Sequence, residues 1–465
     1  MTRDEPNAPK RLIISGSDPE PETAPPSRLI LPGDEPAAEA PKSRIILPPG
    51  AASESVEVPE YPRLRPLLMV PFSDGQRELV LVQDPIGVIP GQPVLGIESL
   101  GLLQLFDGTT SLNDITAAVM RESKDLRIGN MVRDFVAQLD QLYMLETPRF
   151  ETAYAALRDA YHQLEIRPAA LQGRSYPADR DELEKFLDGH FESAVAMREA
   201  ENGSAARARA PRALLAPHLD PRRAGPLIAR AIIELDPEAA GPLRVVVYGT
   251  GHGLIGDLFA LTRKHFETAL GKVTCDTAFV DHIAGKLGDL AWHGELAHRD
   301  EHSIEFLAVY LKRHFGDREV TIVPILCGGF HSLLDDGITP RDSAAFESLI
   351  AAIRGAEQKL GGPTVHVASV DFSHIGPRFG DPAVDDRTQK EVEDRDRAAI
   401  EAARLGDGDR WFETIAAGDD DTRICGFAPT YAMLRAAEPG EGRLLRYDRS
   451  DEPDSSFVSV ATMAW

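Results

Sequence analysis

The chain has few cysteines, no excess of positive charge and no long apolar run. Its three cysteines, Cys275, Cys327 and Cys425, are far apart in 465 residues, which argues against a framework of disulfides. Acidic residues outnumber basic ones by 74 to 50, and no basic stripe offsets this charge, which argues against nucleic-acid binding. No run approaches the roughly 20 apolar residues that span a bilayer, and the N-terminus lacks the apolar core of a signal peptide. We therefore expect a cytoplasmic protein without a membrane segment.

The first 60 residues differ from the rest in composition. They hold 12 of the 35 prolines and no aromatic side chain, so they cannot bury enough apolar surface to offset the entropy of ordering. We expect this tail to be disordered. A basic-aliphatic motif recurs within it at near-regular spacing, as Arg11–Ile14, Arg28–Pro32 and Arg44–Pro48. These repeats are either docking peptides that add a strand to a partner's sheet edge, or chance similarity in a low-complexity tail.

Residues 61–150 have the pattern of a small folded module. A strand is predicted at Leu79–Val82. Three stretches with helical periodicity follow, at Ile97–Phe106, Leu112–Arg121 and Met131–Leu145. Ser111 precedes the second of them and suits a helix N-cap. A β-hairpin followed by three helices is typical of a winged-helix-like domain, but 8 basic against 11 acidic residues disfavour a DNA-reading role.

This module resembles the PqqD-like peptide-recognition domains. The resemblance rests on the run "LLQLFDGTTSLNDITAAVM", with its Asp107-Gly108-Thr109 turn, and on "VRDFVAQLDQLYMLE". PqqD-like domains present a strand edge and a helix groove to a leader peptide, so the resemblance implies a peptide or protein partner. Residues 151–165, which follow the module, are predicted to form a helical connector.

Residues 166–465 have the alternation of an α/β domain. Short apolar runs rich in β-branched residues predict buried strands of a mainly parallel sheet flanked by helices. The clearest strands are Ala213–Ala216, Val245–Tyr248, Val320–Leu326 and Val365–Val370. The predicted helices are Asp181–Phe191, Gly225–Leu235, His302–His314, Ser343–Leu360 and Arg387–Arg404.

Three of these strands end on residues that can carry chemistry. His218 follows the first strand, His252 follows the second within a glycine-rich turn, and the fourth leads into Asp371 and His374. In open α/β sheets the ligand site lies beyond the carboxyl ends of the strands. A single histidine at such a position is more often structural, but three strand ends together predict a shared site. Asp371 can orient the His374 ring for general-base or proton-shuttle work, although a buried aspartate that caps a turn is the simpler interpretation.

Two further residues join this group. His302 follows Asp300 and Glu301 at the start of a predicted helix. The carboxylates suit the positive end of the helix dipole, whereas a histidine gains nothing there and is therefore a functional candidate. Cys425 precedes another helix, where a thiolate is favoured. Two imidazoles and one thiolate could hold copper, zinc or iron with an open coordination position.

The motifs of this domain resemble those of the Memo family, whose microbial members are often called AmmeMemoRadiSam system protein B. The matching blocks occur in the family's order: "RPAALQGRSYPADRDELEKFL", "LLAPHLDP", "VVYGTGH", "DEHSIEF", "IVPILCGG", "VASVDFSH", "ICGFAPTYAML" and "DSSFVSVATMAW". The resemblance implies a fold like that of the class III extradiol (LigB-type) dioxygenases. It also implies metal ligands at His218, His252 and Cys425, the Asp/His pair at Asp371 and His374, and the acidic block ending at His302.

Two departures from the family pattern alter the surroundings of the ligands. The family commonly has Pro-His-Ala-Gly-Tyr where this chain has Pro217-His218-Leu219-Asp220-Pro221, and Ser-His-His where it has Gly251-His252-Gly253. The ligand-type residues are kept, but the substrate-side surface differs from that of the family.

Three functions remain open. The first is a metal-dependent redox enzyme, with iron(II) favoured, His374 as the acid/base, and radical-SAM and AMMECR-type partners implied by the resemblance. The second is a non-catalytic adaptor that binds a peptide or small ligand in the dioxygenase-like pocket. The third is hydrolysis at a zinc centre, which ranks last because no clear glutamate base lies beside the ligands.

Overall fold

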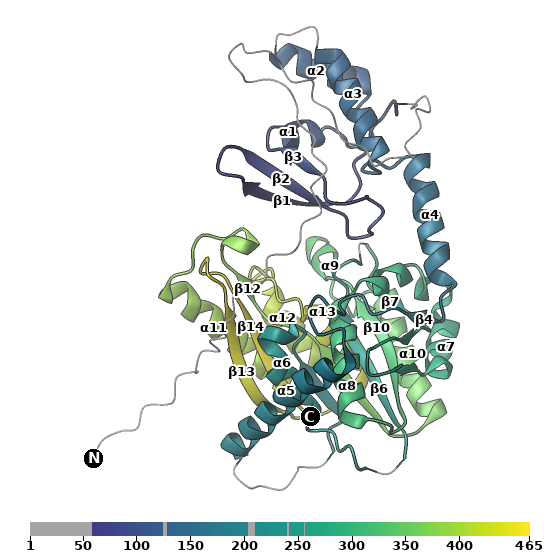
Figure 1. Cartoon of the computed structure of the whole chain (residues 1–465), viewed down its shortest axis with the longest axis vertical. Helices are drawn as coiled ribbons and strands as arrows, with labels where there is room; N and C mark the ends of the chain where they lie inside the picture. Colours follow the sequence, from purple (N-terminus) through teal and green to yellow (C-terminus); the bar gives the residue numbers. More distant parts are fainter. Residues whose placement is uncertain (1–57, 124–127, 203–209, 240, 255) are drawn as a thin grey trace, which may run out of the picture. The chain divides into compact units, whose positions relative to one another are not determined.

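The computed structural model in Figure 1 describes residues 58–123, 128–202, 210–239, 241–254 and 256–465. The three repeats of the N-terminal tail lie outside these ranges. The described chain divides into two compact units, and the boundary falls between Gln163 and Leu164. No helix among the described residues is both long and apolar enough to cross a membrane.

The N-terminal unit begins with a three-stranded antiparallel sheet in the order β1-β2-β3. Its strands are β1 (Leu68–Ser73), β2 (Glu78–Gln83) and β3 (Val94–Gly96). β2 confirms the predicted strand, and its Val80 and Val82 are buried. β1 contains Pro71, which lacks an N–H and is therefore suited to an edge strand. Among the described residues no other strand pairs with β1, so its outer backbone groups are available to an added strand.

Four helices complete this unit, namely α1 (Ser99–Leu103), α2 (Leu112–Ser123), α3 (Ile128–Gln141) and α4 (Pro148–His162). Ser111 caps α2 as predicted, because its Oγ accepts a 3.1 Å bond from the Asp114 N–H. α1 is shorter than predicted, since the chain tightens after Leu103 into turn-type hydrogen bonds. The predicted connector overlaps α4, which starts earlier because Thr147 caps it and a proline takes the first helical position.

The C-terminal unit is built on a nine-stranded sheet with the main order β12-β14-β5-β11-β6-β10-β7. Its strands are β5 (Ala213–Ala216), β6 (Leu243–Thr250), β7 (Phe259–Leu261), β9 (Thr274–Cys275), β10 (Val320–Cys327), β11 (Thr364–Ser369), β12 (His374–Ile375), β13 (Arg443–Asp451) and β14 (Phe457–Ala464). The central strands β5, β11, β6 and β10 run parallel, while β14 and β7 join them antiparallel. The predicted fold class, a mainly parallel sheet flanked by helices, is confirmed. A separate small sheet pairs β4 (Ile166–Arg167) with β8 (His265–Phe266).

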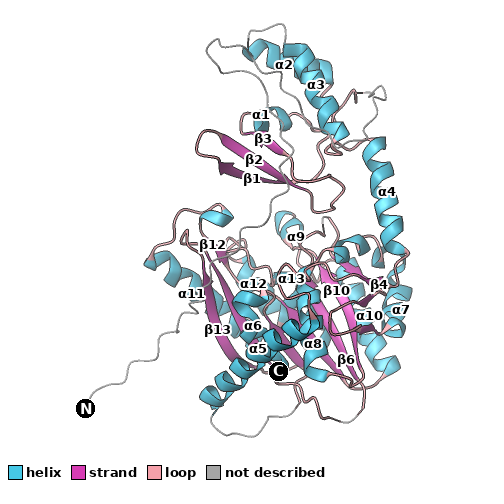
Figure 2. Cartoon of the chain, in the orientation of Figure 1, coloured by secondary structure: helices cyan, strands magenta, loops and turns pink. Residues whose placement is uncertain are grey.

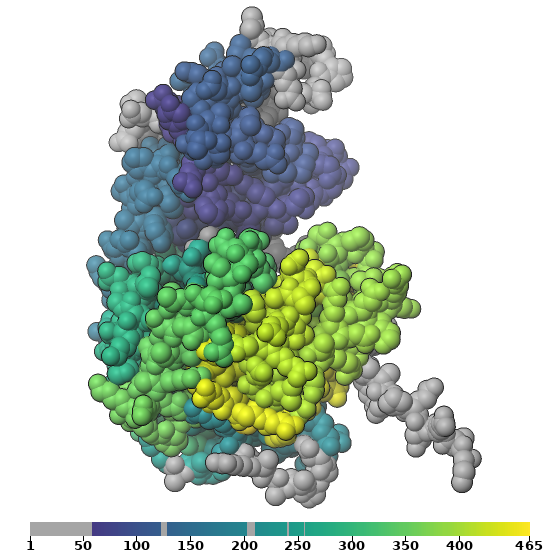
Figure 3. All heavy atoms as spheres, turned by 180° about the vertical axis from the view of Figure 1, so that it is seen from behind, coloured from purple at the N-terminus to yellow at the C-terminus, as the bar shows by residue number. Residues whose placement is uncertain are grey.

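Helices cover both faces of the nine-stranded sheet (Figure 2). On one face pack α5 (Arg180–Asn202), α6 (Pro221–Ile232) and α8 (His302–Phe315). On the other face pack α7 (Thr277–Leu287), α10 (Ala344–Leu360), α11 (Asp386–Arg404), α12 (Gly408–Ala416) and α13 (Phe427–Ala437), the last four of which lie in the green-to-yellow part of Figure 3. Alternate residues of β6 divide between these layers: Val245 and Val247 join the first core, and Val246 and Tyr248 the second. This alternation explains why the strand is apolar throughout. The remaining short helix is α9 (His331–Asp335).

The ends of three central strands lie in register. Ser369 at the end of β11 pairs with Ala216 of β5 and with Gly249 of β6. The residues that follow these three strands therefore lie side by side at the carboxyl ends of the strands. This carboxyl edge of the sheet carries the site.

Candidate metal centre

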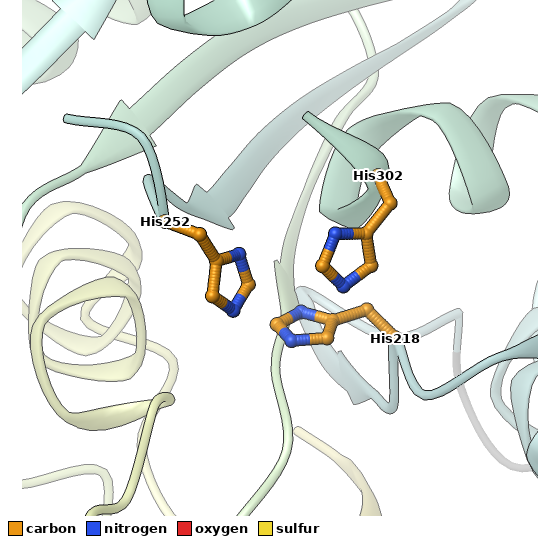
Figure 4. Close-up of side chains that lie close together, drawn as sticks. All are labelled: His218, His252 and His302. Carbon is orange, nitrogen blue, oxygen red and sulfur yellow. The ribbon is translucent and has the colours of Figure 1, made fainter. Parts of the chain in front are cut away.

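Three imidazoles gather at this edge. His218 follows β5, His252 follows β6 and His302 is the first residue of α8. One ring nitrogen of each lies within 4.8 Å of the other two. The ring centroids are 5.2 Å apart for His218 and His252, 5.0 Å for His218 and His302, and 4.7 Å for His252 and His302. Figure 4 shows the three rings turned toward one another.

The Nδ1 atom of each ring faces an oxygen acceptor. His218 Nδ1 lies 2.7 Å from the Ser369 carbonyl oxygen. His252 Nδ1 lies 3.1 Å from both carboxylate oxygens of Glu301, and His302 Nδ1 lies 3.2 Å from Glu301 Oε1. Because these oxygens only accept, each Nδ1 carries a proton, and in the neutral ring the lone pair is on Nε2. This is the tautomer in which a histidine binds a metal through Nε2.

Glu301 holds two of the three rings with one carboxylate. It is buried at the N-cap of α8, where it also accepts hydrogen bonds of 2.9 Å from the backbone N–H groups of Ser303 and His252. Burial alone would raise the pKa of Glu301, but its contacts with His252 and His302 hold that pKa well below its ordinary value. The sequence explained Glu301 only as a helix cap. It does cap the helix, and it orients the imidazoles as well.

The charge of Glu301 acts on the rings unequally. Burial lowers the pKa of His218 well below its ordinary value, and the neighbouring His302 and His252 lower it further. Burial also opposes the charged form of His252, but the carboxylate outweighs burial and raises the pKa of His252. Glu301 therefore favours positive charge on His252, whether a proton or a metal ion at Nε2 carries it.

A buried ion pair anchors the start of α8 beneath these residues. Arg167 donates a 2.8 Å hydrogen bond to the Glu301 carbonyl oxygen and contacts the Glu305 carboxylate at 2.5 Å. The Tyr176 hydroxyl donates a 2.6 Å bond to the same carboxylate. Glu305 thus faces away from the imidazoles, and Arg167 was not predicted to take part. Asp300 is exposed and pairs with Arg299.

A second group of metal-type side chains shares His218. Cys425 Sγ lies 3.4 Å from His218 Nε2, and Asp371 Oδ2 lies 3.6 Å from the same atom. Asp371 Oδ1 also accepts hydrogen bonds from the backbone N–H groups of His218 and Leu219, at 3.0 and 3.2 Å. Burial raises the pKa of Asp371. Burial, together with the Asp371 charge, raises the pKa of the Cys425 thiol well above its ordinary value, which opposes the thiolate that a helix start favours.

The predicted ligand set of His218, His252 and Cys425 is divided between these two groups. Within the described ranges, His252 groups with His218 and His302, whereas Cys425 groups with His218 and Asp371. His302, predicted as a catalytic residue, lies among the ligand-type rings. Cys275 and Cys327 are buried free thiols whose pKa burial raises, and neither belongs to either group.

His374 lies beside the site in β12. Its Nδ1 faces the carbonyl oxygens of Phe372 at 2.9 Å and Arg423 at 3.1 Å. Burial lowers the pKa of His374, although the Asp371 charge opposes this. The lowered pKa favours the neutral ring, and the two carbonyl oxygens favour the proton on Nδ1 and the lone pair on Nε2. This is the state that a general base requires.

The first departure from the family pattern has a structural explanation. Asp220 is the N-cap of α6, where its carboxylate accepts a 2.9 Å bond from the Arg222 N–H, and Pro221 is the first helical residue. Asp220 and Pro221 thus start a helix directly after His218 and fix the path of the chain as it leaves the site.

Comparisons with known proteins support the family predicted from the motifs. A family model described as Memo-like protein matches residues 167–464. A MEMO1 family protein of Aquifex aeolicus is 27% identical over 412 residues, covering 87% of this chain and 99% of that relative. One from Thermus thermophilus is 26% identical over 355 residues, covering 76% and 98%, and one from Methanopyrus kandleri is 29% identical over 306 residues, covering 64% and 97%. The first two alignments are longer than the C-terminal unit, so their similarity extends into the N-terminal unit. The chain belongs to the Memo-like protein family.

Proposed function

We propose that the chain binds a divalent transition-metal ion through His218, His252 and His302 and acts as a non-heme redox enzyme. The observation that carries this proposal is the state of the three rings. Each Nδ1 faces an oxygen acceptor, which favours the lone pair on Nε2, and one ring nitrogen of each histidine lies within 4.8 Å of the other two. Imidazole suits iron, copper and zinc, and imidazole with a nearby carboxylate is the donor combination of non-heme iron(II) oxygenases. We therefore favour iron(II), with Asp371 as the nearby carboxylate.

Other residues of the site would have separate roles in proton transfer and in positioning. A bound iron(II) ion would supply redox chemistry, in which dioxygen is the oxidant and the oxidisable substrate provides the electrons. His374 offers a neutral Nε2 that can take a proton from the substrate and return it. Asp371 holds the backbone of His218 in place, and Cys425 adds a thiol on the same side of His218.

The N-terminal unit fits this proposal as a peptide-recognition module. Its resemblance to PqqD-like domains and the outer edge of β1 favour a peptide or protein partner in a modification pathway. Radical-SAM and AMMECR-type proteins are the partners that the family implies. The competing proposal is an adaptor that binds a ligand in the same pocket without turnover, and metal binding followed by oxygen consumption separates the two.

The test is an anaerobic titration of the full-length chain with iron(II), followed by measurement of oxygen uptake. We expect tight binding by the wild type and binding about 100-fold or more weaker in His302→Ala, since a ligand has a larger effect than the residues that orient it. His331→Ala is the matched control, because that side chain is 66% exposed and belongs to neither group. No binding by the wild type, or equal affinity in both variants, would contradict the metal site. Binding without oxygen uptake would favour the adaptor.

A further inference from the structure

The segment just before Cys425 has an unusual backbone. Asp419, Asp420 and Arg423 have φ values of 52°, 49° and 55°. Side chains other than glycine rarely adopt this left-handed region, and residues held there cluster at functional sites. The segment ends at the cysteine of the candidate site, so its conformation bears on that site directly.

Arg423 and its neighbour hold His374 at three points. The His374 N–H donates a 2.8 Å bond to the Thr422 carbonyl oxygen. The Arg423 guanidinium donates a 3.1 Å bond back to the His374 carbonyl oxygen, and the Arg423 carbonyl oxygen accepts from His374 Nδ1 at 3.1 Å. The backbone and the ring of His374 are therefore fixed by the same short segment.

A carboxylate keeps the guanidinium in place. Arg423 forms an ion pair with Asp381, whose carboxylate also accepts a 3.0 Å bond from the Gly376 N–H just after β12. Arg423 thus links Asp381, the end of β12 and its own strained backbone. Without these links, a side chain other than glycine would gain by leaving the left-handed conformation.

We propose that Arg423 is a positioning residue for His374: its left-handed backbone turns its carbonyl oxygen onto Nδ1, and its guanidinium holds that backbone in place. The consequence is a ring with Nδ1 protonated and the lone pair on Nε2. This inference deepens the proposed function, because it assigns the residue that prepares the proton-transfer group. It does not depend on the metal.

The test measures the tautomer of His374 in the full-length, metal-free chain. Long-range ¹H–¹⁵N correlation spectra of ¹⁵N-histidine-labelled protein show which ring nitrogen is protonated, and His374→Gln identifies the signals. Arg423→Gly and Arg423→Ala both remove the guanidinium, but only glycine adopts the left-handed backbone freely. We expect the wild type and Arg423→Gly to keep the proton on Nδ1, and Arg423→Ala to show a several-fold larger share of the Nε2-protonated form.

The wild-type tautomer in both the alanine and the glycine variant would overturn the proposal, because the Phe372 carbonyl oxygen would then suffice. An equal shift in both variants would overturn the role of the left-handed backbone. If Arg423→Ala does not fold, Asp381→Asn provides the same test, since it keeps Arg423 and removes its anchoring charge. We expect a smaller shift in the same direction, and a loss of thermal stability without any shift would again overturn the proposal. A chain that binds no iron would contradict the proposed function and leave this measurement unaffected.

Discussion

Two groups of histidine and glutamate lie along the same mainly parallel sheet and use the same residue types differently. At the carboxyl edge, Glu301 faces the Nδ1 atoms of His252 and His302, and their Nε2 atoms remain free to bind. Within β11, His366 Nδ1 faces the Tyr248 hydroxyl at 2.9 Å, and its Nε2 faces Glu357 at 3.3 Å. The difference shows that a buried histidine is structural when protein groups occupy both of its nitrogens. It is a candidate ligand when one nitrogen is left free.

The strongest test of this comparison replaces one histidine from each group. His218→Ala removes the imidazole common to both groups of metal-type side chains, so we expect iron(II) affinity to fall more than about 100-fold. His366→Ala should leave the affinity unchanged and destabilise the fold by roughly 2–4 kcal/mol, because it removes a buried, hydrogen-bonded side chain. Isothermal titration and urea unfolding of both variants measure these effects. Loss of metal binding in His366→Ala alone would show that His366 is the ligand and that His218 is structural.

Substitution of the carboxylate beside the metal-type histidines is expected to have the next largest effect on iron(II) affinity. Glu301→Gln keeps the shape of the side chain but removes the charge that orients His252 and His302, so we expect 10–100-fold weaker binding of iron(II). Glu357→Gln is the matched control and should bind iron(II) as tightly as the wild type. Equal affinities in the two variants would show that Glu301 is only a helix cap.

A third test measures how the contribution of Glu357 to the stability of the fold depends on pH. Burial would raise the pKa of Glu357, but hydrogen bonds from His366 and Arg212 outweigh it and lower that pKa to about 2. A lowered carboxylate pKa stabilises the fold above the ordinary value of 4.5 and loses this effect as pH falls toward 2. We expect Glu357→Gln to cost about 1 kcal/mol at pH 7, since the Arg212 pair is partly exposed, and clearly less near pH 3. Urea unfolding at the two pH values measures the difference, and a constant cost would contradict it.

Substitution of Cys425 is expected to have the smallest effect on iron(II) affinity. The pKa of Cys425 is raised, so ligation by its sulfur would first require loss of a proton. If the three imidazoles hold the ion, Cys425→Ser changes iron(II) affinity less than about threefold. Cobalt(II) provides a direct probe, since a bound thiolate adds a charge-transfer band in the near ultraviolet. Such a band in the wild type, absent in Cys425→Ser, would instead favour the set of His218, His252 and Cys425.

The sequence predicted the central fold and the location of the site because both depend on local patterns. Apolar strands that end on His218, His252 and Asp371 predict one edge, since the carboxyl ends of parallel strands meet there. The detailed grouping depends on contacts between distant residues. Glu301 reaches back to His252, and Arg167 binds the Glu301 carbonyl across 134 positions of sequence. The strands β13 and β14, which extend the sheet antiparallel to β5, also depend on pairing that no local period reveals.

His218 belongs to both groups of metal-type side chains, yet it can serve them only through Nε2, because its Nδ1 donates to the Ser369 carbonyl oxygen. One lone pair binds one ion, so an ion held by either group excludes an ion in the other. For the proposed metal site we therefore expect one ion at a time on His218, and two ions bridged through this imidazole are not expected.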